Sequence, residues 1–273
     1  HYNHALRRSS VRDQEFVQDL ALRMGVPFFT ETNRVRLPSN VSVEEFARER
    51  RYGFLRRAVR SSRAVSGALA HTRDDLAETV LMRILRGTGL SGLRAMLPKR
   101  ELNGMIIIRP FLAISRREID SYIKDNRLRW IEDPSNRSLE FFRNVVRLKL
   151  IPYLERNAGR GVKSNLANLA SIAASDYDLI EVHAVDLFKT LAEKRGKGVV
   201  FPINKIVILH SALRRTLFRL AIEEIKGDLN AIGYEHLTAV ERLSLRGKSG
   251  MTLVLPKGIL VKRSNVNVAV MHR

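Results

Sequence analysis

The chain has 273 residues, 45% of them hydrophobic, which is enough for one large or two ordinary globular domains. Lysine and arginine number 48 against 28 acidic residues, and the resulting formal charge of +20 favours a polyanionic partner, nucleic acid first of all. The absence of cysteine excludes disulfide frameworks, thiolate zinc sites and cysteine nucleophiles, and the lack of an apolar run of membrane-spanning length predicts a soluble, intracellular protein.

The first 60 residues alternate between strand and helix patterns. Residues 1–7 read as the end of a strand and its turn, and residues 13–24 place apolar side chains at helical spacing before a Gly-Val-Pro stop. Residues 28–37 predict a second strand and residues 43–60 a second helix, with a turn at Pro38-Ser39-Asn40. This alternation predicts an α/β fold with a parallel sheet.

The stretch from His71 to Gly92 carries the most informative spacing. Residues 64–70 are small and apolar, as in a buried parallel strand, and they deliver His71 to the sheet edge where α/β proteins bind ligands. Asp75 and Glu78 follow His71 at steps of four and three, which predicts one imidazole and two carboxylates on one helical face. Such a face can hold a cation, or it can be a solvated acidic face, and both interpretations stay open.

The next elements bring paired basic side chains. Residues 105–108 predict a strand that ends at Arg109, and Ser115 to Glu118 form a capping box that opens a helix to about residue 126. After a polar turn at 130–136, Arg143 and Arg147 lie one helical turn apart. The pair is either surface decoration or a phosphate clamp, because the guanidinium fork matches phosphate oxygens.

The character of the sequence changes near residue 157, where we predict a boundary between domains 1–157 and 158–273. Helical patterns cover residues 166–191 and 211–225. Short strand patterns at 251–255, 259–262 and 266–271 predict a terminal hairpin or meander. The second domain is therefore expected to be α-rich with a β tail.

Several ungapped blocks between residue 1 and about residue 157 match one known family in unchanged order. They read HYNHALR, ARERRYGFL, HTRDDLAETVLMRILRGTGLSGL, IIIRPFLAISRREID, WIEDPSN and FFRNVVRLKLIP. These blocks resemble the bacterial tRNA(Ile)-lysidine synthetases, which are PP-loop ATP-pyrophosphatases. The resemblance implies a Rossmann-like, parallel-sheet domain of the N-type ATP-pyrophosphatase class, followed by the smaller α-rich domain.

The family's reaction sets the expected chemistry. With ATP and Mg²⁺, members join free L-lysine to the wobble cytidine of a tRNA(Ile) with a CAU anticodon through an adenylated cytidine, and AMP and pyrophosphate are released. The resemblance thus implies a cytoplasmic ligase that forms a carbon–nitrogen bond, with no membrane partner, and a homodimer is compatible with it. The basic composition fits the tRNA partner.

The matching motifs also imply roles for particular residues. Asp75 and Glu78 resemble the acidic pair that receives the lysine substrate, and one of them would accept the proton that the attacking amine loses. The ATP contacts fall on Arg51, His71 and the supporting Arg48. The tRNA or the reaction centre would be held by Arg143, Asn144, Arg147 and the supporting Arg109. Arg51 and Arg143 also count among the catalytic candidates, and no metal ligands are assigned.

One departure from the family is large. The phosphate-binding motif Ser-Gly-Gly-x-Asp-Ser, expected just before His1, occurs nowhere in the sequence. We therefore expect the chain as printed to bind the tRNA but to need an upstream segment with this motif to make lysidine. The alternatives are a truncated or degenerate, non-catalytic tRNA-binding member and, less similar, a tRNA thiolation enzyme, whose sulfur chemistry the absence of cysteine disfavours.

Overall fold

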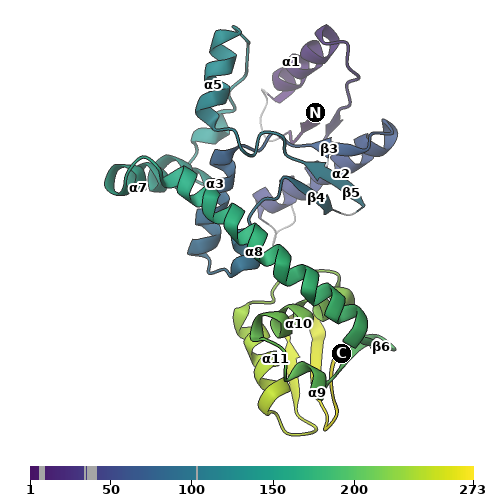
Figure 1. The fold of residues 1–273 in the computed structure, drawn as a ribbon. Helices are drawn as coiled ribbons and strands as arrows, with labels where there is room; N and C mark the ends of the chain where they lie inside the picture. Colours follow the sequence, from purple (N-terminus) through teal and green to yellow (C-terminus); the bar gives the residue numbers. More distant parts are fainter. Residues whose placement is uncertain (6–9, 34, 36–41, 103) are drawn as a thin grey trace. The chain divides into compact units, whose positions relative to one another are not determined.

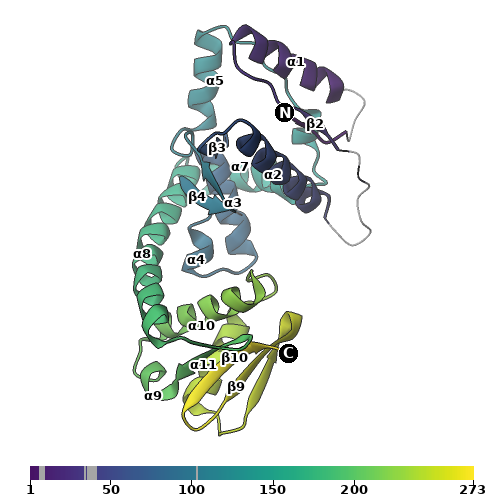
Figure 2. The same cartoon turned by 90° about the vertical axis from the view of Figure 1, so that its right-hand side faces the viewer.

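We describe the protein from a computed structural model, in which residues 1–5, 10–33, 35, 42–102 and 104–273 are described. The chain forms two compact units (Figures 1 and 2). The first unit holds residues 1–78 and 96–164, and the second holds residues 79–95 and 165–273. These units are defined by compactness and not by independent folding, so the predicted domain division at residue 157 stays a prediction.

The first unit begins with alternating strands and helices. Its early elements are β1 (Tyr2–Asn3), α1 (Ser10–Arg23), β2 (Glu31–Thr32), α2 (Val43–Ser61), β3 (Ser66–Ala68) and the first part of α3 (Arg73–Leu85). Strand β1 pairs in parallel with β2, and β3 pairs in parallel with β5 (Met105–Ile108). Strand β4 (Lys99–Leu102) adds an antiparallel edge to give the order β3-β5-β4. The predicted α/β class with parallel pairing is confirmed.

The rest of the first unit is helical. Helix α5 (Arg116–Asp125) opens with the predicted capping box, in which Ser115 accepts from the Glu118 N–H and the Glu118 carboxylate accepts from the Ser115 N–H. A 3₁₀ turn (Pro134–Arg137) follows. Helix α6 (Phe142–Val145), a π-helical segment (Val146–Leu150) and α7 (Ile151–Ala158) then run on from one another. Buried Val146 and Ile151 anchor this run.

The second unit holds a contiguous apolar core on an antiparallel sheet. The sheet order is β6-β7-β10-β9-β8. Its strands are β6 (Glu193–Arg195), β7 (Gly198–Pro202), β8 (Thr252–Leu255), β9 (Ile259–Arg263) and β10 (Asn267–His272). Helices α10 (Ser211–Lys226) and α11 (Tyr234–Arg246) cover one face of it (Figure 2). Helices α4 (Leu90–Leu93), α8 (Val162–Leu191) and α9 (Ile203–Ile206) complete the chain, the first three residues of α8 counting with the first unit.

Several sequence-based bounds differ from the structure. Helix α1 begins at Ser10 rather than at residue 13, and the strand predicted over residues 28–37 is limited to Glu31–Thr32 among the described residues. The predicted turn at Pro38-Ser39-Asn40 lies outside the described residues. The predicted terminal meander, β8-β9-β10, is present. It is part of a larger sheet because β10 also pairs with β7, which lies more than 60 residues earlier in the sequence. No helix among the described residues is long and apolar enough to cross a membrane.

Candidate active site

Helix α3 begins with a reciprocal cap that fixes Asp75. The Thr72 N–H donates to Asp75 Oδ2 at 2.8 Å, and the Asp75 N–H donates to Thr72 Oγ1 at 3.3 Å. The Thr72 hydroxyl donates to the same carboxylate oxygen at 2.8 Å. Because Thr72 is the capping residue, His71 lies before the helix, and the prediction that it shares a helical face with the two carboxylates is wrong.

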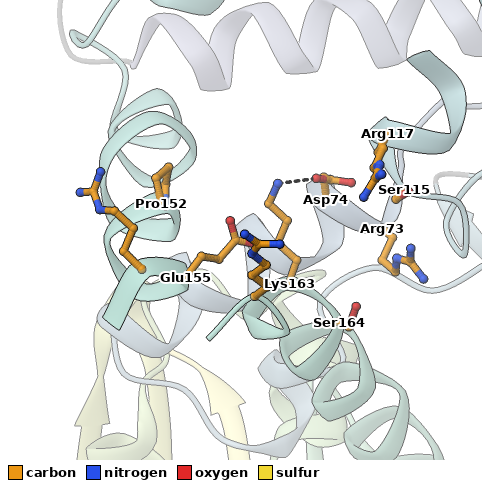
Figure 3. A pocket seen from close by; sticks show the side chains of 10 residues that line it. Arg73, Asp74, Ser115, Arg117, Pro152, Glu155, Lys163 and Ser164 are labelled. Carbon is orange, nitrogen blue, oxygen red and sulfur yellow. Dashed lines mark ion pairs between the residues drawn. The ribbon is translucent and has the colours of Figure 1, made fainter. Parts of the chain in front are cut away.

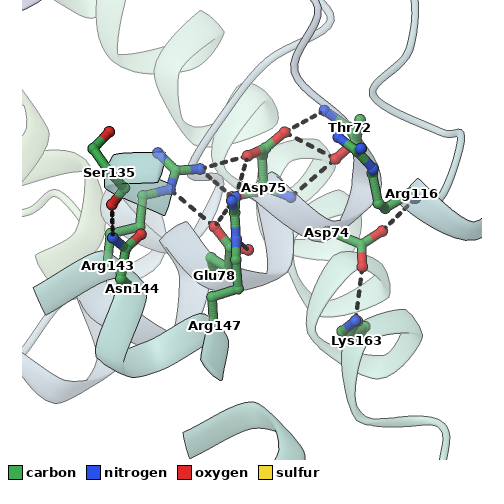
Figure 4. A network of polar contacts seen from close by, with 10 residues as sticks. All are labelled: Thr72, Asp74, Asp75, Glu78, Arg116, Ser135, Arg143, Asn144, Arg147 and Lys163. Atoms are coloured by element: carbon green, nitrogen blue, oxygen red, sulfur yellow. Dashed lines mark hydrogen bonds and ion pairs between the residues drawn. The ribbon is translucent and has the colours of Figure 1, made fainter. Parts of the chain in front are cut away.

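The two carboxylates of α3 face two arginines of the α6–α7 run (Figure 4). Arg143 donates from Nε to Glu78 Oε2 and from Nη2 to Asp75 Oδ1, both at 2.9 Å. Arg147 donates from Nε to Glu78 Oε1 at 2.6 Å and from Nη2 to Asp75 Oδ1 at 3.1 Å. We call Asp75, Glu78, Arg143 and Arg147 the quartet. The two arginines, which the sequence places one helical turn apart, therefore both contact carboxylates in this structure.

The quartet is closed on its acidic side and open on its basic side. The Glu78 side chain is 3% exposed and that of Asp75 is 18% exposed, whereas Arg143 and Arg147 retain 30% and 37%. Two negative and two positive side chains leave the cluster formally neutral. Solvent, or a ligand, therefore reaches the guanidinium groups before it reaches the carboxylates.

Hydrogen bonds and neighbouring positive charges keep Asp75 ionised despite its burial. Burial alone would raise the pKa of this carboxyl group, but the Thr72 backbone N–H, the charge of Arg143 and the Thr72 hydroxyl together lower it below its ordinary value. The hydrogen bond to Glu78 correspondingly raises the pKa of Arg147. Asp75 is therefore ionised near neutral pH, and it contributes charge rather than basicity.

His71 lies beside this cluster as a neutral ring. Burial, followed by the charges of Arg109, Arg143 and Arg51, lowers its pKa to about 4, although Asp75 acts in the opposite direction. Its Nδ1 atom is buried, and no hydrogen-bond partner for it occurs among the described residues. An unpaired buried polar atom is costly, so this atom is suited to contact a bound molecule.

Arg109 is the other buried group with an unused polar atom. The residue is 7% exposed, its Nη1 donates to the Leu97 carbonyl at 2.6 Å, and its Nε has no partner within the described part of the chain. Asn144 is equally buried, and its amide donates to the carbonyls of Ser135 and Ser138. The RNA-binding roles of Arg109 and Asn144 stay predictions, but burial gives both a structural role that spacing did not indicate.

The structure gathers most of the predicted residues around α3. Arg51 and Arg109 are close enough to His71 to lower its pKa, and His71 also responds to Asp75 and Arg143 of the quartet. Arg48 lies on α2, where the central carbon of its guanidinium group is 5.2 Å from the centroid of the Tyr52 ring. Sequence reasoning missed Thr72 as the residue that orients Asp75, although Thr72-x-x-Asp75 is a recognisable capping pattern.

The residues present suit an anionic nucleotide better than a metal cage. Cationic Arg51 and Arg109 and a neutral imidazole with an unused nitrogen fit phosphate and polar groups. Among the described residues no group of three or more His, Cys, Asp or Glu side chains is placed to hold a metal ion. Mg²⁺ commonly binds through substrate phosphates and waters with one or two carboxylates, so such an ion would be held mainly by the phosphates.

Comparison with known proteins extends this picture. Residues 1–154 match the family model described as a PP-loop domain. The tRNA(Ile)-lysidine synthase of Geobacter sulfurreducens is 36% identical over 100% of this chain and 58% of its own length, and that of Caldanaerobacter subterraneus is 34% identical over 89% and 52%. A Listeria monocytogenes bifunctional protein TilS/HprT is 30% identical over 97% of this chain and 41% of its own.

A likeness to a solved structure supports the fold alone. The U34-tRNA thiolase NcsA from Methanococcus maripaludis matches with a TM-score of 0.52 and 16% identity, over 62% of this chain and 58% of that one. The chain spans about half the length of the curated relatives it matches. The family model covers more than half of the chain, and the quoted blocks lie within it. The chain therefore belongs to the PP-loop domain family, and it is similar to the tRNA(Ile)-lysidine synthases named above.

Proposed function

We propose that the protein is a tRNA(Ile)-lysidine synthase, which uses ATP to join free lysine to the wobble cytidine of a tRNA(Ile) with a CAU anticodon. The observation that carries the proposal is the quartet beside a neutral His71, in a chain similar to such synthases over almost its whole length. The substrate places the reaction in the cytoplasm. Mg²⁺ would accompany the ATP phosphates, and a homodimer is compatible with this function.

The quartet defines how lysine would be received. Asp75 Oδ1 already accepts from both arginines, and Oδ2 accepts from Thr72, so an ammonium ion must displace a donor. An added ammonium also gives a neutral cluster a net positive charge. Lysine therefore binds well only when Arg143 or Arg147 turns outward to a phosphate, which their partial exposure allows.

This exchange would couple the two substrates. A phosphate that draws one guanidinium away leaves Asp75 and Glu78 with an uncompensated negative charge, and this charge attracts the lysine ammonium. Bound ATP or tRNA thus prepares the lysine site, and lysine alone meets a closed cluster. We expect lysine affinity to rise when the phosphate-bearing substrates are present.

The test is lysine transfer to defined tRNAs. Protein expressed from its complete reading frame is incubated with ATP, labelled lysine and either tRNA(Ile) with a CAU anticodon or a methionine tRNA with the same anticodon. Label in the isoleucine tRNA only, dependent on ATP, is the expected result. Binding of tRNA without any label in RNA would instead support a non-catalytic tRNA-binding protein.

A further inference from the structure

A polar cavity lies beside the start of α3. Its volume is about 760 Å³, a size that accommodates a ligand rather than a few waters. The lining comes from the first turns of α3, α5 and α8 and from α7 and the loop after it: Arg73, Asp74, Ser115, Arg117, Pro152, Glu155, Arg156, Arg160, Lys163 and Ser164. None of these residues belongs to the quartet.

The cavity is strongly basic. Five of its side chains are Lys or Arg and two are acidic, so the formal balance is 5 − 2 = +3. Lys163 is engaged with Asp74 at 2.8 Å. Arg117, Arg156 and Arg160 are exposed and have no hydrogen-bond or ion-pair partner within the described part of the chain. Three guanidinium groups thus line one space, and none of them is paired with a carboxylate of the described residues.

The geometry of the walls favours an extended anion. Arg73, Ser115 and Arg117 lie on one side, and Pro152 and Glu155 lie on the other (Figure 3). Asp74 ties the walls together, because it accepts from the Arg116 backbone N–H at 2.7 Å as well as from Lys163. The described residues that line the cavity include no aromatic ring, so they offer charge and hydroxyl groups but no surface for stacking a base.

The cavity and the quartet use neighbouring residues of one helical turn. Asp74 points to the cavity, whereas Asp75 points to the quartet (Figure 4). A ligand of the quartet that carries several phosphates on a chain can therefore extend into the cavity. A polynucleotide backbone meets this requirement, because its phosphates are regularly spaced and need no base contacts to bind.

We propose that this cavity is a docking site for successive phosphates of the RNA backbone, held by Arg117, Arg156 and Arg160. The proposal rests on the proposed function, since it takes the RNA to be the tRNA whose base reaches the quartet. The site adds affinity and orientation and takes no part in the chemistry. It therefore controls how well the tRNA binds and leaves the rate at saturation unchanged.

The experiment compares two triple variants with equal net charge. The first is Arg117→Ala/Arg156→Ala/Arg160→Ala, and the matched control removes three exposed arginines of the same unit as Arg12→Ala/Arg60→Ala/Arg100→Ala. Filter binding of the tRNA is measured across a salt series. For the cavity variant we expect affinity to fall about tenfold or more at ~0.1 M salt, with a salt slope shallower by roughly 2 to 3.

The control variant should change neither quantity appreciably. Equal losses in both variants would show that diffuse charge holds the RNA, and no loss in the cavity variant would show that the RNA does not enter; either result overturns the proposal. A measurement with pyrophosphate distinguishes RNA phosphates from a free phosphate anion as the ligand of the cavity. If pyrophosphate raises the melting temperature of the parent but not of the cavity variant, while tRNA binding is unaffected by the substitution, the cavity binds a free anion and the RNA assignment is wrong.

These outcomes remain distinct from failure of the proposed function. The binding measurements need neither ATP nor lysine, so they stay informative if no lysidine forms. If lysidine does form, the cavity variant should raise KM for tRNA and keep kcat, whereas a lowered kcat would place the cavity in the chemistry and contradict a docking role. Unchanged melting temperatures would verify that the exposed substitutions leave the fold intact.

Discussion

The two units each contain an arginine–glutamate network, and the networks differ in how they are closed. In the second unit Glu241 pairs with Arg214 at 2.9 Å and with Arg215 at 3.0 Å. Arg214 is 8% exposed, and its remaining donors reach the backbone carbonyls of Val207 and Leu209. The central Arg214–Glu241 pair is therefore enclosed by the protein itself, whereas Arg215, at the edge of the network, is 31% exposed.

The quartet of the first unit is built from the same groups but is open on one side. Its carboxylates are buried, while its guanidinium groups are about one third exposed. Beside it stand His71 Nδ1 and Arg109 Nε, which have no partner among the described residues. A buried ion pair is therefore not itself a sign of function. Partial exposure and unused polar atoms next to the pair indicate a ligand site.

Neutralising the closed network should give the largest effect. Glu241→Gln leaves Arg214 buried without its counter-charge, and we expect the free energy of unfolding to fall by about 3–5 kcal/mol. Urea denaturation followed by circular dichroism measures the loss. Asp186→Asn, on an exposed pair of the same unit, is the control and should cost less than about 0.5 kcal/mol. A Glu241 variant as stable as this control would mean that the network is not closed.

Neutralising the open network should act on activity instead. Asp75→Asn keeps a side chain that can accept from Thr72 but removes the charge that attracts lysine. We expect lysidine formation to fall by about 100-fold or more and tRNA adenylation to stay detectable. Labelled lysine and labelled ATP report the two steps separately. Asp120→Asn, on the exposed face of α5, is the control. Normal lysine kinetics in Asp75→Asn would remove this residue from the lysine site.

The same expectation applies to the second carboxylate, with a larger structural component. Glu78→Gln also removes charge from the lysine site, but Glu78 is almost fully buried against both arginines. Lysidine formation should therefore fall together with the melting temperature. A Glu78→Gln protein that keeps normal lysine kinetics would reassign the role of this residue.

The smallest effect should come from pH acting on His71. Its pKa in the folded protein, about 4, lies below the ordinary value near 6.5, so between these values the unfolded chain binds a proton that the folded chain does not. Stability must therefore fall as pH drops from about 6.5 towards 4. At pH 5 we expect a loss of about 1 kcal/mol, because the ring is partly solvated. Melting curves of the parent and of His71→Gln at pH 7 and pH 5 measure the difference.

The variant should lose less stability than the parent over this range. An equal loss in both proteins would assign the pH dependence to other groups. The lowered pKa of Asp75 acts in a separate window, since its contribution is present above the unfolded pKa near 3.9 and disappears only as pH falls through the lower folded value.

Local signals made much of the first unit predictable. The capping box at Ser115, the apolar strand Met105–Ile108 and the acidic start of α3 depend on neighbours within a few residues, and the structure contains all three. Strands β4 and β6 escaped prediction because their residues, Lys-Arg-Glu-Leu and Glu-Lys-Arg, are mostly exposed and carry no apolar alternation. Each becomes a strand by pairing in a tight hairpin with the strand that follows it, β4 with β5 and β6 with β7, and not through its own residue preferences.

The candidate site was predictable in its residues but not in its contacts. The spacing of Arg143 and Arg147 indicated that they project together, yet their partners lie at least 65 residues away in sequence. Spacing along one helix has no information about such a pairing. The cavity was missed for the same reason, since Arg117 on α5 is far in sequence from Arg156 and Arg160, and only the fold brings it to the same cavity.

The π-helical segment Val146–Leu150 has a consequence for how this protein can change in evolution. It contains Arg147, of the quartet, and precedes Glu155 and Arg156, which line the cavity. Deleting one residue such as the exposed Leu148 would change the helical phase between Arg147 and the residues that follow. Insertions and deletions in this segment are therefore expected to be selected against, even at positions where substitutions are tolerated. A Leu148 deletion should weaken tRNA binding more than Leu148→Ala does. Equal binding by the two variants would show that the length of this segment does not set the orientation of the residues after it.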